Sequence, residues 1–272
     1  MLAGSCFAAP AAAVPIGAIA SVQPREREAL DHALHGRGEA VISLLFDATD
    51  RSDAESALLI AALGDAGRIS DAHGVHGRCG DAPRCAVATA ALELRGGDRG
   101  RAVKLLAKAL PKHRDDIGLR MAMGEALYAT GKDVAARKLL DPLADLYAAG
   151  KIATIAEQVA VARSLALNGY FKDANQVMAD ANEAVATPAE RKLVELNWGK
   201  LFLSKHNFRD ADAAFASVLK LDVRHEEAVV AMARIDLDSD HDVGRARKRL
   251  DKVLKRNPHS VAALVVRAEV AI

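Results

Sequence analysis

The chain has 272 residues, of which 51% are hydrophobic and only 4% are aromatic, so alanine and leucine must supply most of any packed core. Its 37 basic and 36 acidic residues leave a formal net charge of +1, which excludes a strong overall field for nucleic acid or an anionic membrane. No stretch shows the apolar–polar alternation of a strand, so the composition favours an all-α protein.

Residues 1–24 form an apolar, Ala/Pro-rich leader, in which Met1 to Val22 carry no charge. Small residues at Ala11, Ala12 and Ala13 are typical of the cleavage region of a secretory signal, although the basic start of such a signal is missing. The alternative is a disordered tail on a cytoplasmic protein. We expect export, for example to a bacterial periplasm, slightly more than a cytoplasmic location. The segment is too short and too rich in proline for a stable membrane-spanning helix.

Residues 25–52 form a polar, helix-prone stretch that ends in the apolar run Ala40 to Phe46. The first unit of a repeat array needs a cap over its apolar face. We therefore expect residues 25–52 to form a pair of capping helices.

From residue 53 onward, one apolar pattern recurs with a period near 34 residues, which is typical of stacked helical hairpins. Residues four and seven positions after each marker alanine are mostly apolar, and these spacings fall on one face of a helix. The pattern therefore predicts the second helix of each hairpin. The marker alanines are Ala72, Ala102, Ala136, Ala174, Ala211 and Ala246.

Five positions before each marker alanine lies a residue expected to close the turn between the two helices. Glycine occupies most of these positions because it adopts the left-handed conformation that ends a helix. These turn residues are Gly67, Gly97, Gly131, Gly169, His206 and His241. A small residue on most first helices predicts a close approach of the two helices, at Ala90, Gly124, Ala162 and Gly199. The last full unit has Arg234 at this position, beside Ala233, which is compatible with a register shift of one residue.

This pattern resembles the tetratricopeptide repeat over about Asp53 to Ile272. The best single unit runs from Lys192 to His225, with Gly199, Phe202, Ala211 and Phe215 at matching positions. The resemblance implies an all-α, right-handed α-solenoid of five to six helical hairpins over residues 53–272, followed by a terminal helix. Pro142 departs from the pattern, and Asp141 as an N-cap predicts a break and restart of the second helix there.

Four residues able to bind a metal lie close together in sequence, at His73, His76, Cys79 and Cys85. A zinc site is one interpretation, but the spacing fits no zinc signature. A disulfide between Cys79 and Cys85 is the second interpretation and suits an exported protein. The third is a glycine-rich loop between repeats that carries two free thiols. We take Cys79 and Cys85 as a candidate disulfide and expect no metal site.

No motif in the sequence indicates an active site. His225-Glu226 is not followed by the second histidine of a zinc peptidase, because position 229 is Val229. The alternating acidic run from Asp236 to Asp242 lacks the glycine and glutamate that a calcium loop requires. We therefore expect no catalytic residues and no cofactor.

The concave groove lined by the first helices is the expected binding surface. In the family resembled, polar residues on these helices hold peptide ligands, so the resemblance implies a non-catalytic scaffold for a peptide or helix of a partner. The candidate groove residues are Glu125, Tyr128, Arg163, Asn197 and Lys200. We expect a protein partner and no nucleic acid, and the apolar helix 260–272 predicts self-association. The alternative function is the N-terminal repeat module of a larger exported enzyme, such as a zinc peptidase.

Overall fold

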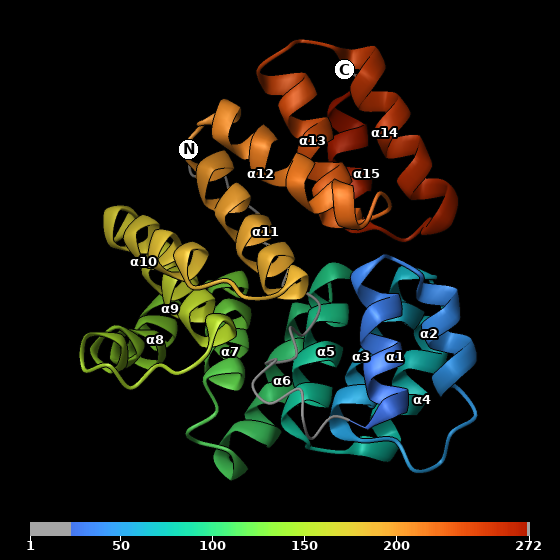
Figure 1. The fold of residues 1–272 in the computed structure, drawn as a ribbon, viewed down its shortest axis with the longest axis vertical. Coiled ribbons are helices and arrows are strands. Elements are labelled where there is room, and N and C mark those ends of the chain that lie inside the picture. Colours follow the sequence, from blue (N-terminus) through green and yellow to red (C-terminus); the bar gives the residue numbers. More distant parts are fainter. Residues whose placement is uncertain (1–22, 271–272) are drawn as a thin grey trace.

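The computed structural model describes residues 23–270, and the predicted leader at residues 1–22 lies outside this range. Within it the chain forms successive helical hairpins and no strand, which confirms the all-α fold class. The hairpins follow one another in chain order (Figure 1). The helices are α1 (Pro24–Leu34), α2 (Gly38–Leu45), α3 (Asp53–Asp65), α4 (Ile69–Cys79), α5 (Pro83–Arg95), α6 (Arg99–Ala109), the short 3-10 helix η2 (Leu110–Lys112), α7 (Ile117–Ala129), α8 (Asp133–Ala148), α9 (Ile155–Leu167), α10 (Phe171–Glu183), α11 (Pro188–Ser204), α12 (Phe208–Leu221), α13 (Glu226–Asp238), α14 (Val243–Arg256) and α15 (Val261–Glu269).

Side-chain caps start several of the first helices. Ser52, Thr154 and Thr187 each accept a hydrogen bond from a backbone N–H in the first turn of α3, α9 and α11, respectively. The carboxylate of the glutamate three residues later accepts a hydrogen bond from the N-cap backbone N–H, which completes a capping box. These local signals fix where the first helix of a hairpin begins.

The repeated sequence pattern corresponds to the repeated structure. All six marker alanines lie in second helices and are fully buried. Four predicted turn glycines have positive φ angles, and the two histidines at the equivalent positions, His206 and His241, also have positive φ angles of 56° and 54°. The predicted turns are therefore confirmed in every repeat, even where glycine is absent.

The first helices of the hairpins form one layer of the solenoid, and the second helices form the other. Each first helix packs against the next first helix, from α3 through α5, α7, α9, α11 and α13 to α15. Comparable packing between successive second helices is not found within residues 23–270. The first helices therefore line the inner side of the curve, and the second helices lie apart from one another on its outer side.

Small residues on the first helices allow each hairpin to close. A Cβ atom added to Gly124 would lie 2.6 Å from Cγ of Leu140, and one added to Gly199 would lie 2.9 Å from the Phe215 ring. In the last full hairpin Ala233, and not Arg234, is the fully buried small residue. This bears out the register shift of one residue.

The predicted break at Pro142 is wrong, because α8 continues through it as a single helix. Proline removes one backbone hydrogen bond from a helix interior. The fully buried Leu140 and Leu143, on either side of it, anchor both parts of the helix to the core. Asp141 does not act as an N-cap but accepts a hydrogen bond from Asn168 at 2.6 Å.

The curve brings the first hairpin against a hairpin much later in the chain. The Lys192 ammonium on α11 donates to the carbonyl oxygens of Leu34 at 2.9 Å and Ala33 at 3.3 Å, at the end of α1. It also pairs with the buried Asp222 at 2.9 Å. A lysine therefore caps the C-terminal end of α1, in addition to the hydrogen bond that the Ala33 carbonyl accepts from the Gly36 N–H. We call this contact the closure contact.

Replacing Gly36 with alanine should weaken the closure contact. Gly36 has φ +66°, and a Cβ added there would lie 2.0 Å from Oδ1 of Asp222. Gly131 has a similar φ of +73° but no neighbour within 4 Å, so Gly131→Ala measures the left-handed strain alone, about 1–2 kcal/mol. Urea denaturation should show a larger loss of stability for Gly36→Ala. Equal losses would mean that the closure contact does not form in solution.

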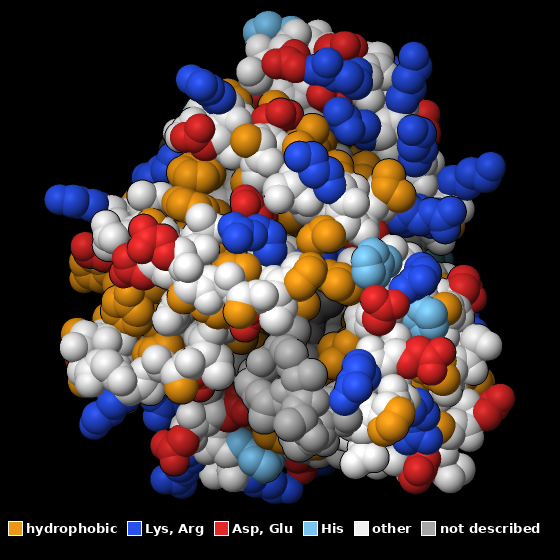
Figure 2. All heavy atoms as spheres, viewed as in Figure 1, with side chains coloured by type: hydrophobic (Ala, Val, Ile, Leu, Met, Phe, Trp, Pro, Cys, Tyr) orange, Lys and Arg blue, Asp and Glu red, His pale blue; other side chains and the backbone are white. Residues whose placement is uncertain are grey.

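The surface carries mixed charge, and basic side chains gather over α14. Figure 2 shows Lys and Arg side chains concentrated at the upper right, where α14 lies in Figure 1. Exposed basic residues there include Arg247, Lys248, Lys252 and Lys255. Among residues 23–270, no helix combines the length and the apolar character that crossing a bilayer requires.

Candidate functional site

Three of the predicted groove residues meet on the inner side of the curve. Glu125 of α7 and Arg163 of α9 form an ion pair, and Lys200 of α11 pairs with Glu227 of α13. Glu227 also favours the charged form of Arg163. The charged form of Arg95 on α5 is favoured first by its ion pair with Asp65 at 2.6 Å, and then by Glu226 and Glu227. We call Arg95, Glu125, Arg163, Lys200 and Glu227 the central charge cluster. It joins five first helices that are consecutive along the solenoid.

The repeat itself explains why these residues converge. Glu125, Arg163 and Lys200 each directly follow the small residue of their helix. The same position in successive hairpins faces the same side of a solenoid. Sequence analysis missed Glu227 and Arg95, which do not occupy this position. Glu125, Arg163 and Lys200 could be found from sequence because each is a charged residue that follows the small residue of its unit, in consecutive units.

The central charge cluster is largely removed from solvent. The side chains of Arg95, Arg163 and Lys200 are 16%, 17% and 16% exposed, and the Glu125 carboxylate is 6% exposed. Burial lowers the pKa of the Arg163 guanidinium to about 10, which leaves it charged at neutral pH. Burial also lowers the pKa of the Lys200 ammonium, whereas the Glu227 carboxylate opposes this shift. Because water solvates these side chains poorly, each charge is stabilised mainly by the opposite charge of its ion-pair partner.

His225 lies beside this cluster as the N-cap of α13. Its Nδ1 atom accepts a hydrogen bond from the Ala228 backbone N–H at 3.4 Å. Burial sets the pKa of the imidazole well below its usual value, and the nearby cations Lys192, Lys200 and Arg95 lower it further. The ring is therefore neutral in the folded protein.

The half-buried, neutral His225 should make the fold less stable in mild acid. The unfolded chain takes up a proton near pH 6.5 whereas the folded chain does not, so this group costs up to about 1.4 kcal/mol per pH unit below that value. His225→Asn keeps an N-cap and removes the titration. Urea denaturation from pH 7.5 to pH 5 should give a flatter pH dependence for the variant. Parallel curves for the two proteins would contradict the assignment.

The other two predicted groove residues make internal contacts. The Tyr128 hydroxyl donates to Asn168 at 2.6 Å and so links α7 to the end of α9. The side-chain amide of Asn197 donates to the Leu193 carbonyl at 2.8 Å, and its Oδ1 is buried without a hydrogen-bond partner in the described part of the chain. The roles of all five residues in binding stay predictions.

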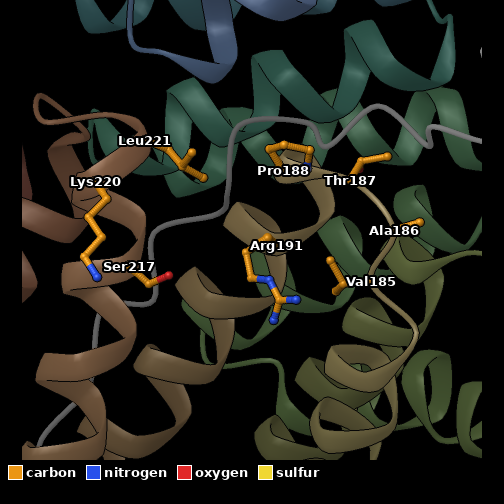
Figure 3. Close-up of a pocket in the computed structure, with 8 residues that line it drawn as sticks. All are labelled: Val185, Ala186, Thr187, Pro188, Arg191, Ser217, Lys220 and Leu221. Atoms are coloured by element: carbon orange, nitrogen blue, oxygen red, sulfur yellow. The ribbon is translucent and has the colours of Figure 1, made fainter.

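An open cavity of about 380 Å³ lies away from the central charge cluster, between the α10–α11 loop and the end of α12. Figure 3 shows Arg191 between the loop residues on one side and Lys220 on the other. The Arg191 guanidinium donates to Asn182 at 2.7 Å. Among the described residues, the cavity lining includes neither histidine nor an acidic residue, and consists of Val185, Ala186, Thr187, Pro188, Arg191, Ser217, Lys220 and Leu221. This set suits a small anionic or apolar group.

The cysteine-containing segment is more ordered than the sequence analysis suggested. The prediction of a loop is wrong for its first part, because His73 and His76 lie within α4 and Cys79 is its last residue. Cys85 lies in the first turn of α5. The structure joins Cys79 to Cys85 by a disulfide with a Cα–Cα distance of 6.4 Å. The oxidation state of this pair in the cell stays a proposal.

Comparisons with known proteins place the fold. No family model and no curated protein matches this chain. Among solved structures, a thermophilic TPR protein of Thermus thermophilus is 18% identical, with a TM-score of 0.50, over 70% of this chain and 97% of that one. A tetratricopeptide repeat protein of Parabacteroides merdae is 11% identical, with a TM-score of 0.54, over 92% of this chain and 100% of that one.

The human IFIT1 dimer, solved with PPP-AAAA, is also similar, at 13% identity and a TM-score of 0.53. The match covers 80% of this chain but only 57% of the IFIT1 chain. Identities this low establish the fold alone. The fold is that of tetratricopeptide-repeat proteins, as the sequence pattern predicted.

Proposed function

We propose that this chain, which has the tetratricopeptide-repeat fold, is a non-catalytic scaffold that binds a peptide or helix of a protein partner along its inner face. The observation that carries the proposal is the central charge cluster, in which consecutive first helices present charged side chains toward one another. A solenoid with a periodic inner face suits an extended ligand that contacts several repeats at once.

The cluster also indicates how a partner would be selected. Arg163 and Lys200 are neutralised by Glu125 and Glu227 within the chain. A partner carboxylate that faces either cation would exchange an internal ion pair for an intermolecular one. Affinity would then depend on charge complementarity and fall as salt rises.

A selection from a random peptide-display library tests the proposal, with direct binding measured for the enriched peptides. The site variant is Lys200→Met with Glu227→Gln, which removes both members of this ion pair. The matched control is Lys138→Met, on the outer helix α8. Thermal unfolding of each variant shows whether the fold is retained.

The proposal expects the site variant to lose at least tenfold in affinity and the control to bind as the unmodified chain does. Equal affinity of both variants would show that the peptide does not bind at the inner face. Because the IFIT1 structure holds PPP-AAAA, the same measurement includes that molecule as a ligand. Tighter binding of PPP-AAAA than of any selected peptide would contradict a protein partner.

The repeat module of a larger exported enzyme is the second candidate. The comparisons add no support for it, since the similar solved structures above are repeat proteins. A non-catalytic role therefore agrees better with the fold, and localisation outside the cytoplasm stays a prediction from residues 1–24.

Self-association through the C-terminal helix is a separate expectation. On α15, Leu264 and Val265 are 46% and 48% exposed. Two such aliphatic side chains on one terminal helix favour burial against a second surface. Light scattering at increasing concentration should show a dimer that Leu264→Ser with Val265→Ser shifts toward monomer. A chain that stays monomeric at millimolar concentration would exclude this contact.

A further inference from the structure

The joint between α4 and α5 brings three metal-binding side chains together. His76 lies one turn before the end of α4, Cys79 ends that helix, and Cys85 lies in the first turn of α5. One nitrogen of His76 and the two sulfur atoms all lie within 4.8 Å of one another. We call these three residues the joint cluster.

The imidazole of His76 has an unused ligand atom. Its Nδ1 atom is buried and has no hydrogen-bond partner among the described residues. A buried ring nitrogen normally has a donor or acceptor, so an orphaned one beside two sulfur atoms needs an explanation. A metal ion bound by both sulfur atoms and by Nδ1 of this ring would supply the missing partner.

We propose that the joint cluster is a redox-controlled zinc site, which binds one Zn²⁺ when the Cys79–Cys85 disulfide is reduced. Two thiolates and one imidazole are a ligand set that zinc favours, with water at the fourth position. The oxidised chain has no thiolate in the cluster and does not bind the ion. The disulfide and the zinc ion are alternative ways of holding α4 to α5.

The proposal differs from the sequence-based expectation of no metal, which rested on the spacing of four residues. His73 belongs to another group, because its Nε2 lies 2.7 Å from a Glu93 carboxylate oxygen. The carboxylate of Asp81 is also engaged, by Lys112 at 2.5 Å and Lys108 at 3.2 Å. The fold therefore selects three ligands out of the candidates in this segment.

The chemistry requires a reductant and balances as a two-electron step. A dithiol or a pair of monothiols transfers two electrons to the disulfide and becomes a disulfide itself, and Cys79 and Cys85 each gain a proton. Zn²⁺ then displaces both thiol protons into solvent and forms two Zn–S bonds and one Zn–N bond.

Cobalt titration of the full-length chain tests the site, since Co²⁺ bound by thiolates gives sulfur-to-metal charge-transfer absorption. All samples carry Cys6→Ser, because Cys6 is the third cysteine and lies outside the described residues. The reduced protein should bind one equivalent of Co²⁺, which Zn²⁺ displaces, and the oxidised protein should bind none. Thermal unfolding of the reduced protein with and without Zn²⁺ gives a second measurement.

Two histidine variants separate this site from simple thiol binding. His76→Ala should weaken metal affinity at least tenfold, whereas His73→Ala should leave it unchanged. Cys79→Ser, at a half-buried position, should abolish the charge-transfer band in a folded protein. The proposal is overturned if the oxidised protein binds equally well, if the reduced protein binds no metal, or if His76→Ala has no effect.

Discussion

Replacing Gly124 with leucine is expected to destabilise the protein by about 3 kcal/mol or more, because this point in the hairpin has no space for a side chain. Three side-chain atoms of Leu140 lie within 2.7 Å of the position that a Cβ would occupy. The Leu140 side chain has no space to move into, since it is fully buried in a core formed by α7, α8, α9, α10 and α11. Urea denaturation gives the change in the free energy of unfolding.

Gly77→Leu is the matched control for this change. Gly77 is also a helical glycine, in α4, but it is exposed and a Cβ there would have no neighbour within 4 Å. Helix propensity alone should then stabilise the protein by up to about 1 kcal/mol. The double variant Gly124→Ala with Leu140→Ala should lose less stability than the sum of the losses of the two single variants, because the smaller residue 140 leaves space for the added Cβ. A Gly124→Leu protein as stable as the control would contradict the hairpin packing.

Replacing Arg163 with methionine is expected to cost about 3–5 kcal/mol at neutral pH, because it leaves a buried carboxylate without its partner. The Glu125 side chain is only 6% exposed, and Arg163 is its ion-pair partner across α7 and α9. Without that partner the folded state should favour the protonated carboxyl, so the pKa of Glu125 in the variant should rise above its unfolded value. The deficit should then shrink as the pH falls.

A double-mutant cycle with Glu125→Gln isolates the coupling between the two side chains. The double variant Glu125→Gln with Arg163→Met should recover much of the lost stability, since neither member of this pair is then left charged and alone. Its stability should also lose the pH dependence of the single variant between pH 7 and pH 4. A double variant less stable than Arg163→Met alone would show that the pair does not act as a unit.

The repeat architecture could be predicted from sequence because its signals are local and recur. Marker alanines at a near-constant spacing identify second helices, and the residue five positions earlier closes each turn. The marker Ala72 also locates α4, whereas the glycine content of His73 to Cys85 had left a loop as one interpretation of that segment. There the burial of Ala72 and Val75 on one face outweighs the low helix propensity of glycine. The break predicted at Pro142 is wrong for a similar reason, because core contacts of the flanking Leu140 and Leu143 hold α8 together.

The candidate site could be predicted only in part. The inward position of Glu125, Arg163 and Lys200 follows from their shared place in the repeat. Their pairing with one another and with Glu227 depends on the rotation between successive hairpins. The closure contact of Lys192 with α1 depends on the sum of those rotations over more than 150 residues. No local sequence pattern specifies the total of these rotations, so these contacts could be identified only from the structure.

Hydrogen exchange of the chain with and without its tightest selected peptide tests the central claim most directly. The account predicts slower exchange in the first helices α7, α9, α11 and α13, which carry most of the central charge cluster. The second helices α8, α10 and α12 should exchange as they do in the free chain. Protection confined to those second helices, or no protection at all under saturating peptide, would contradict binding along the inner face.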